Sequence, residues 1–209
     1  MTKLLVIQAH PHTENSLSLT VGKTFIDTYR QAHPDDEIII RDLYTQSVPP
    51  LNDVTINAWK KEKYGLPMNA EEQQLLAEHM KWLNEFIEAD KYVFINPMYN
   101  GFLPAEMKQY IDLTVVPRKT FRYTSNGPVG LLTGKKALHI QAAGSVYHHG
   151  DAKLAANDLG DLYLTSVLKS FGVTDVQQIF IEGADAHRDQ RQNILEAAIE
   201  KARQVAQTF

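Results

Sequence analysis

The sequence predicts a single α/β domain in which a five-stranded parallel sheet is covered by helices on both faces. Short apolar segments with the pattern of strands alternate five times with segments of helical periodicity. The strand-like segments are apolar along their whole length, so neither face of the sheet is expected to meet water. The chain has 209 residues, of which 44% are hydrophobic, and this suffices for the core of one doubly wound domain.

The first strand and the first helix are clearly marked. Residues 4–9 form an apolar run that ends at the polar sequence His10-Pro11-His12, which is typical of a buried strand entering a loop. Apolar side chains then recur at helical spacing from Leu19 until His33-Pro34, where the proline stops the helix. Three consecutive isoleucines at 38–40 predict the second strand, because β-branched side chains favour strands.

An insertion is expected after the second strand, at about residues 43–70. We expect a short helix in this insertion and do not interpret it as a linker, because Trp59 and Tyr64 lie within it. The next helix is expected at 70–89, since its apolar side chains line one face.

The rest of the chain continues the same alternation. Strands are expected at 92–95, 137–140 and 176–181, and helices are expected after Pro104, at about 153–171 and at about 187–206. Between them, the segment at about 119–134 predicts a hairpin or an extended loop, because it contains the turn sequence Asn126-Gly127-Pro128.

Composition excludes several classes of function. The net charge of −4 and the pI of about 6.1 give no field that would gather nucleic acid or anionic lipid. The absence of cysteine excludes disulfides, thiolate metal sites and cysteine nucleophiles. The apolar run near the N-terminus is too short for a signal peptide or a membrane span. We therefore expect a cytoplasmic protein with no nucleic-acid partner and no membrane insertion.

Three loops follow the carboxyl ends of the first, third and fourth strands, where ligands bind in such sheets. The first loop, residues 9–18, contains neither a G-x-G-x-x-G nor a G-x-x-x-x-G-K-[ST] motif. It offers the hydroxyls of Ser16 and Ser18 and backbone amides at the start of a helix, which can hold a phosphate without a lysine or arginine. Alternatively, one of these serines only caps the helix.

The second loop combines Tyr99, Asn100, Gly101 and Phe102 ahead of Pro104. An aromatic ring, a carboxamide and a glycine suit a flat heteroaromatic ligand with hydrogen-bonding edges. Alternatively, the asparagine and the glycine only turn the chain between a strand and a helix.

The third loop, residues 142–151, permits close approach of a ligand to the backbone at Gly144. Two histidine pairs are candidate metal ligands: His10 with His12, and His148 with His149. We expect no metal site, because Pro11 interrupts the first pair, adjacent residues rarely point together, and a closed site needs three or four ligands.

Several motifs carry a resemblance to a known family. These motifs are Pro97-Met98-Tyr99-Asn100, Lys108-Gln109-Tyr110-Ile111-Asp112, Thr120-Phe121-Arg122-Tyr123-Thr124, Asn126-Gly127-Pro128 and Gly134-Lys135-Lys136-Ala137. With them, nearly the whole chain resembles the bacterial FMN-dependent NADH azoreductases, which belong with the flavodoxin-like quinone reductases. The resemblance implies a flavodoxin-like sheet of strand order 2-1-3-4-5 and a homodimer with one FMN per subunit. It also implies hydride transfer from NADH or NADPH through FMN to quinones or azo compounds.

The resemblance further implies cofactor contacts in the three loops. The phosphate contacts are Ser16, Leu17 and Ser18, with His10 nearby; the ring contacts are Met98, Tyr99, Asn100 and Gly101; the contacts at the pyrimidine edge are Ala142, Ala143, Gly144 and Ser145. As catalytic candidates we name Tyr147 and His148, which have the chemistry to protonate or orient a reduced quinone.

The chain departs from the family pattern in two places. The ring segment usually reads Met-Tyr/Trp-Asn-Phe, but here Gly101 precedes Phe102, and the edge segment lacks the arginine of the frequent Ser-Arg-Gly-Gly. Two other functions stay open: a flavin-binding regulatory subunit of a membrane transporter, and a flavodoxin-type electron carrier.

Overall fold

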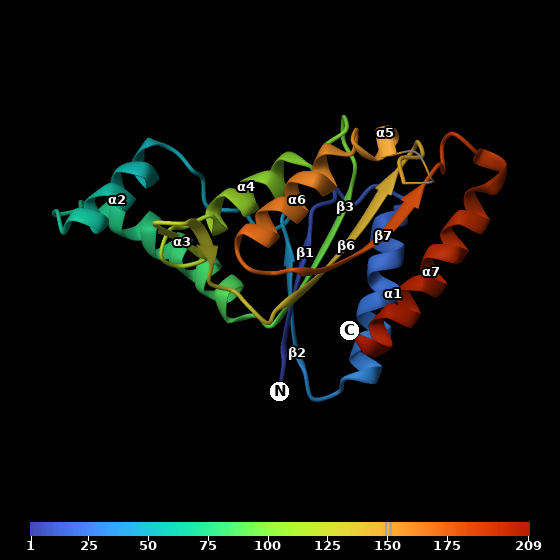
Figure 1. Cartoon of the computed structure of the whole chain (residues 1–209), viewed down its shortest axis with the longest axis horizontal. Coiled ribbons are helices and arrows are strands. Elements are labelled where there is room, and N and C mark those ends of the chain that lie inside the picture. Colours follow the sequence, from blue (N-terminus) through green and yellow to red (C-terminus); the bar gives the residue numbers. More distant parts are fainter. Residues whose placement is uncertain (149, 151) are drawn as a thin grey trace.

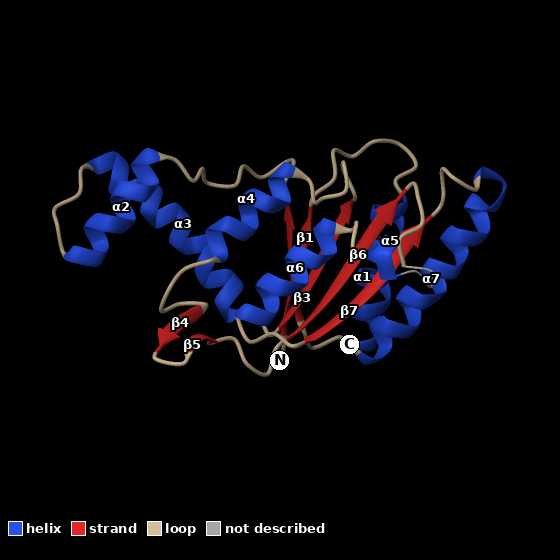
Figure 2. Cartoon of the chain, turned by 45° about the horizontal axis from the view of Figure 1, so that its top comes forward, coloured by secondary structure: helices blue, strands red, loops and turns tan. Residues whose placement is uncertain are grey.

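A computed structural model describes residues 1–148, 150 and 152–209. Its main sheet has five parallel strands in the order β2-β1-β3-β6-β7, which confirms the predicted 2-1-3-4-5 order (Figure 1). The strands are β1 (Lys3–Gln8), β2 (Glu37–Asp42), β3 (Lys91–Pro97), β6 (Lys136–Ala143) and β7 (Asp175–Glu182). Their carboxyl ends lie at one edge, as Figure 2 shows.

Helices cover both faces of the sheet (Figures 1 and 2). The helices are α1 (Leu17–Ala32), α2 (Asp53–Tyr64), α3 (Ala70–Glu88), α4 (Ala105–Thr114), α5 (Ala152–Ala155), α6 (Leu159–Ser170) and α7 (Arg191–Thr208), and a 3₁₀ turn, η1 (Arg188–Gln190), precedes α7. Leu4 and Val6 of β1 pack toward α1 and α7, while Leu5 and Ile7 pack toward α3, α4 and α6. Because side chains alternate along a strand, a central strand covered on both sides must be apolar throughout.

α1 is placed on the sheet by an unusually close contact. It buries Val21, Phe25 and Tyr29 at helical spacing, which accounts for its amphipathic pattern. Between them, Gly22 approaches the sheet so closely that a Cβ there would lie 2.6 Å from Cδ1 of Ile95 in β3. The glycine thus brings the start of α1 close to the carboxyl ends of the strands.

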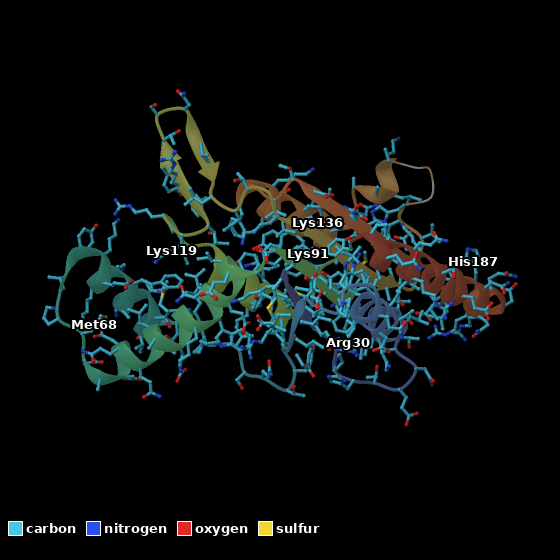
Figure 3. The ribbon with its side chains drawn as sticks, turned by 90° about the horizontal axis from the view of Figure 1, so that it is seen from below. Arg30, Met68, Lys91, Lys119, Lys136 and His187 are labelled. Atoms are coloured by element: carbon cyan, nitrogen blue, oxygen red, sulfur yellow. The ribbon has the colours of Figure 1, made fainter. Side chains whose placement is uncertain are left out.

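The segments outside the five-stranded sheet form two extensions. α2 and the outer end of α3 reach away from the sheet (Figures 1 and 2), and α3 begins with a capping box between Asn69 and Glu72. A hairpin of β4 (Phe121–Thr124) and β5 (Gly127–Gly130) projects from the main body in Figure 3. Among the described residues, no helix is both long enough and apolar enough to cross a membrane.

One predicted helix is interrupted. The continuous helix expected at 153–171 is wrong, because α5 and α6 are separated by residues 156–158. The interruption has a local cause: the fully buried carboxylate of Asp158 accepts the N–H of Asp161 at 2.9 Å and starts a new helix.

Candidate functional site

A cleft of about 290 Å³ lies at the carboxyl ends of β1, β3, β6 and β7. It brings together residues from all three predicted loops: His10, Ser16, Leu17, Ser18, Met98, Tyr99, Ala142, Ala143 and Gly144. Asn100, Gly101 and Ser145 belong to the same loops but do not line the cleft. The position matches the crevice where doubly wound sheets bind ligands.

The first loop presents the amino end of α1 to the cleft. Ser16 is the N-cap of this helix, and its Oγ accepts the N–H of Leu19 at 3.2 Å. The predicted capping by a serine is therefore confirmed for Ser16, and it does not compete with anion binding, because further N–H groups of the first turn and the helix dipole remain directed at the same place. The Ser18 hydroxyl lies 3.4 Å from that of Ser16, and Asn15 holds the chain in a left-handed conformation at φ 59°.

His10 is a buried, neutral donor at the edge of this loop. Burial lowers the pKa of its imidazole, and the neighbouring His12 lowers it further. Its Nδ1 accepts the backbone N–H of His12 at 3.0 Å, so the proton of the neutral ring lies on Nε2. The ring of His12 is instead hydrogen-bonded to Asp42 at 2.6 Å. The two rings thus have separate partners.

The second loop is a two-residue turn with one aromatic wall. The N–H of Tyr99 donates to the carbonyl of Phe102 at 2.9 Å, and the reverse bond is 3.0 Å. The two residues between them have φ values of 52° (Asn100) and 76° (Gly101), which is the geometry that favours an Asn-Gly sequence. The turning role weighed for these two residues is confirmed, and it leaves Tyr99, 40% exposed, to line the cleft.

The third loop is closed from behind by the loop that follows β7. The backbone N–H groups of Asp185 and Ala186 donate to the carbonyl of Gly144 at 3.2 and 3.1 Å. A Cβ at Gly144 would lie 2.7 Å from Oδ2 and 3.3 Å from Cβ of Asp185, so the Asp185 side chain packs closely against this glycine.

Sequence reasoning missed part of the lining. Ala184, Asp185 and Arg191 come from the loop after β7 and the start of α7, and Thr13, Glu14 and Asn15 complete the first loop. The last strand of a parallel sheet ends at the same edge as the other strands. Its position alone therefore predicts that the loop after β7 also contributes to the cleft.

Tyr147 and His148 do not line this cleft. Their backbone N–H groups donate to Oε2 of Glu182 at 3.1 and 3.0 Å, and the His148 ring donates through Nδ1 to Oε1 at 2.7 Å while it stacks on Phe180. The buried carboxylate therefore anchors the third loop, and the catalytic role of Tyr147 and His148 stays a prediction. His149 and Asp151 lie outside the described residues.

Three potential metal ligands meet beneath the third loop. Atoms of His148, Asp158 and Glu182 lie within 4.8 Å of one another. Each carboxylate is already used in a hydrogen bond, because Asp158 also accepts from Gln141 at 2.5 Å. Within the described part of the chain, the cluster is best understood as a buried network that holds the loop.

Comparison with known proteins agrees with the fold. A family model described as "Flavodoxin-like fold" matches residues 2–206. The chain is 54% identical to FMN-dependent NADH:quinone oxidoreductase 2 of Lactiplantibacillus plantarum over 210 residues, and 50% identical to FMN-dependent NADH:quinone oxidoreductase 1 of Lactococcus lactis over 214 residues; each alignment covers 100% of both chains.

Solved structures show the same similarity. An azoreductase from Bacillus anthracis superposes with a TM-score of 0.93 at 36% identity, with 100% of both chains covered. A second protein, an FMN-dependent NADH-azoreductase from Bacillus anthracis in complex with FMN, has a TM-score of 0.93 at 30% identity, with 99% of this chain and 98% of the other covered. The fold and the cleft define a flavodoxin-like protein. Within that class, the chain belongs to the family of FMN-dependent NADH:quinone oxidoreductases.

Proposed function

We propose that this chain is an FMN-dependent oxidoreductase that passes hydride from NADH or NADPH through FMN to quinones or azo compounds. The observation that carries the proposal is the cleft, in which an anion site at the start of α1 lies beside the aromatic wall of Tyr99. The relatives with full-length similarity are named as enzymes, which favours an enzyme over the transporter-subunit and electron-carrier alternatives.

The residues of the cleft fit FMN. Ser16 and Ser18, with the amides of the first turn of α1, suit the phosphate. His10 offers Nε2–H as a further donor. Gly144 of the third loop lines the same cleft, and Tyr99 supplies a flat wall.

Bound FMN would supply the hydride chemistry, and the protein would supply position and environment. The side chains of Met98 and Tyr99 would orient the ring and exclude water from one side. We assign Tyr147 and His148 to proton transfer or orientation at the reduced acceptor, as the sequence predicts. Glu182 holds the backbone of both residues in place.

The proposal includes a homodimer. Apolar side chains remain exposed beside the second loop, among them Tyr99 at 40%, Leu159 at 55% and Leu162 at 48%. Leu159 is tied to this loop through its N–H, which donates to the carbonyl of Gly101 at 3.1 Å. Exposed apolar groups that lie together mark interaction surfaces, and a second copy of the chain would cover these. Light scattering should then give twice the chain mass of 23.7 kDa.

NADH and NADPH are electron donors of the cytoplasm, and we propose that the protein acts there.

The visible spectrum of the purified protein tests the proposal. We expect flavin absorbance that is bleached by anaerobic NADH or NADPH, and recovered on addition of a quinone or an azo dye. Parallel titrations with the two donors and the two acceptor classes establish the preference for each. A colourless protein that takes up no added FMN contradicts the proposal.

A further inference from the structure

Arg191 connects two segments of the cleft that are far apart in the sequence. It is the first residue of α7, and its guanidinium reaches across to the first loop. Its Nη2 lies 3.5 Å from the carbonyl oxygen of Asn15, the residue directly before the N-cap of α1, and its Nη1 lies 3.3 Å from Oδ1 of Asp185. The guanidinium therefore contacts the residue next to the predicted phosphate contact Ser16, and it lines the same cleft.

The charges around the cleft favour an anion partner for this arginine. Among the described lining residues, Glu14 and Asp185 are acidic, and Arg191 carries the one full positive charge, because His10 is neutral. A phosphate monoester carries a charge of about −1.5 to −2 at pH 7. The dipole of α1 offers about half a unit of positive charge, so Arg191 is the largest positive charge that the described lining can offer to a phosphate.

The present contacts of Arg191 leave it available. Both are long for charge-assisted hydrogen bonds, and the Asp185 side chain is 72% exposed, so the pair is weak. A guanidinium has five N–H donors, and these two contacts use only two of them. An incoming phosphate can therefore bind the remaining donors without breaking a strong interaction.

We propose that Arg191 binds the FMN phosphate and makes the cleft selective for FMN over riboflavin. Arg191 lines the same cleft as Ser16 and Ser18, and from the start of α7 it would add a guanidinium to the anion site of the first loop. This inference rests on the proposed use of FMN, and it adds a residue from the start of α7, which the sequence motifs do not include.

Flavin titration of the apoprotein tests this role independently of turnover. Quenching of flavin fluorescence gives the dissociation constants of FMN and of riboflavin for wild type, Arg191→Gln and the control Arg188→Gln. The control removes the same charge from an exposed residue of η1 that does not line the cleft. We expect Arg191→Gln to weaken FMN about 10- to 30-fold and riboflavin less than about 2-fold, in line with loss of a partly exposed charge-assisted bond.

Further measurements separate binding from folding and from general charge effects. Thermal melting of each apoprotein reports folding, and Arg191→Lys should recover part of the FMN affinity, because lysine keeps the charge but loses the planar fork. The inference is overturned if Arg191→Gln keeps the wild-type ratio of FMN to riboflavin affinity, or if Arg188→Gln lowers that ratio equally. If wild type binds neither flavin, the proposed function itself has failed.

Discussion

The contact between Gly22 and Ile95 should control the stability of the domain in a measurable way. Alanine in a helix interior is favoured over glycine by about 1 kcal/mol. In Gly22→Ala, however, the new methyl would meet Ile95 Cδ1 at 2.6 Å, and overpacking of this kind costs about 1–3 kcal/mol. We expect the overpacking to dominate, so that Gly22→Ala destabilises the protein by up to about 2 kcal/mol.

A double-mutant cycle isolates this contact. Ile95→Val removes Cδ1 and should cost about 0.5–1.5 kcal/mol alone. In the Gly22→Ala background the nearest remaining atoms of residue 95 would be Cγ2 at 3.1 Å and Cγ1 at 3.3 Å, which small shifts can relieve. The double variant should then be destabilised by about 1 kcal/mol or more less than the sum of the two single costs, because the pair is in contact.

Urea unfolding of the apoproteins of wild type, the two single variants and the double variant measures the cycle. In thermal unfolding, each 1 kcal/mol should shift Tm by about 2–4 °C for a domain of this size. FMN titration adds a second readout, because displacement of α1 from β3 also displaces the anion site at its start. Additive effects, or a Gly22→Ala variant that gains the full helix-propensity benefit, would refute the reasoning.

Three other predictions concern the N-cap of α1, the third loop of the cleft and the stability of the protein at acidic pH. Ser16→Ala should lower the unfolding free energy by about 1 kcal/mol and weaken FMN, because one side chain serves both cap and phosphate; urea unfolding and flavin titration check this. Tyr147→Phe and His148→Gln should each lower quinone turnover when the protein is saturated with FMN, and unchanged steady-state rates would remove their catalytic assignment. Burial acts to raise the pKa of Asp36, but hydrogen bonds from Tyr29 and from the backbone, with a nearby lysine, overcome it and lower this pKa to about 2. The ionised Asp36 stabilises the fold fully above its unfolded pKa of about 4, and this stabilisation is lost as pH falls toward 2. In Asp36→Asn, the unfolding free energy should therefore depend less on pH between about 4 and 2.

The sheet and much of the cleft follow from local sequence patterns. Strands such as residues 4–9 are apolar on both faces, which is sufficient to indicate a sheet covered on both sides. Carboxyl ends of parallel strands share an edge, so the loops with Ser16, Tyr99 and Gly144 could be expected to converge. The structure brings all three to one cleft.

The position of Arg191 could not be predicted in the same way. It depends on how α7 packs against α1, and α7 buries Ala198, Ala202 and Ala206 at four-residue spacing. Small side chains permit close approach of two helices but give a weak hydrophobic signal in the sequence. No local motif relates Asn15 to a residue 176 positions later.

The interruption between α5 and α6 has a similar origin. A helical pattern continues through residues 153–171, but Asp158 is buried against Gln141 of β6 and caps the second helix. A buried carboxylate needs such partners, and the strand that supplies them is distant in sequence. Local periodicity therefore predicts the helical residues but not the break.

These cases share one consequence for the function of the cleft. Its lining consists mainly of backbone and short side chains, so the positions of the lining atoms are set by contacts beneath them. Gly22 places α1, and Glu182 holds the third loop through two backbone N–H groups. Interiors of native density transmit small displacements instead of absorbing them. Flavin affinity should therefore respond to substitutions at these supporting residues as strongly as to many in the lining itself.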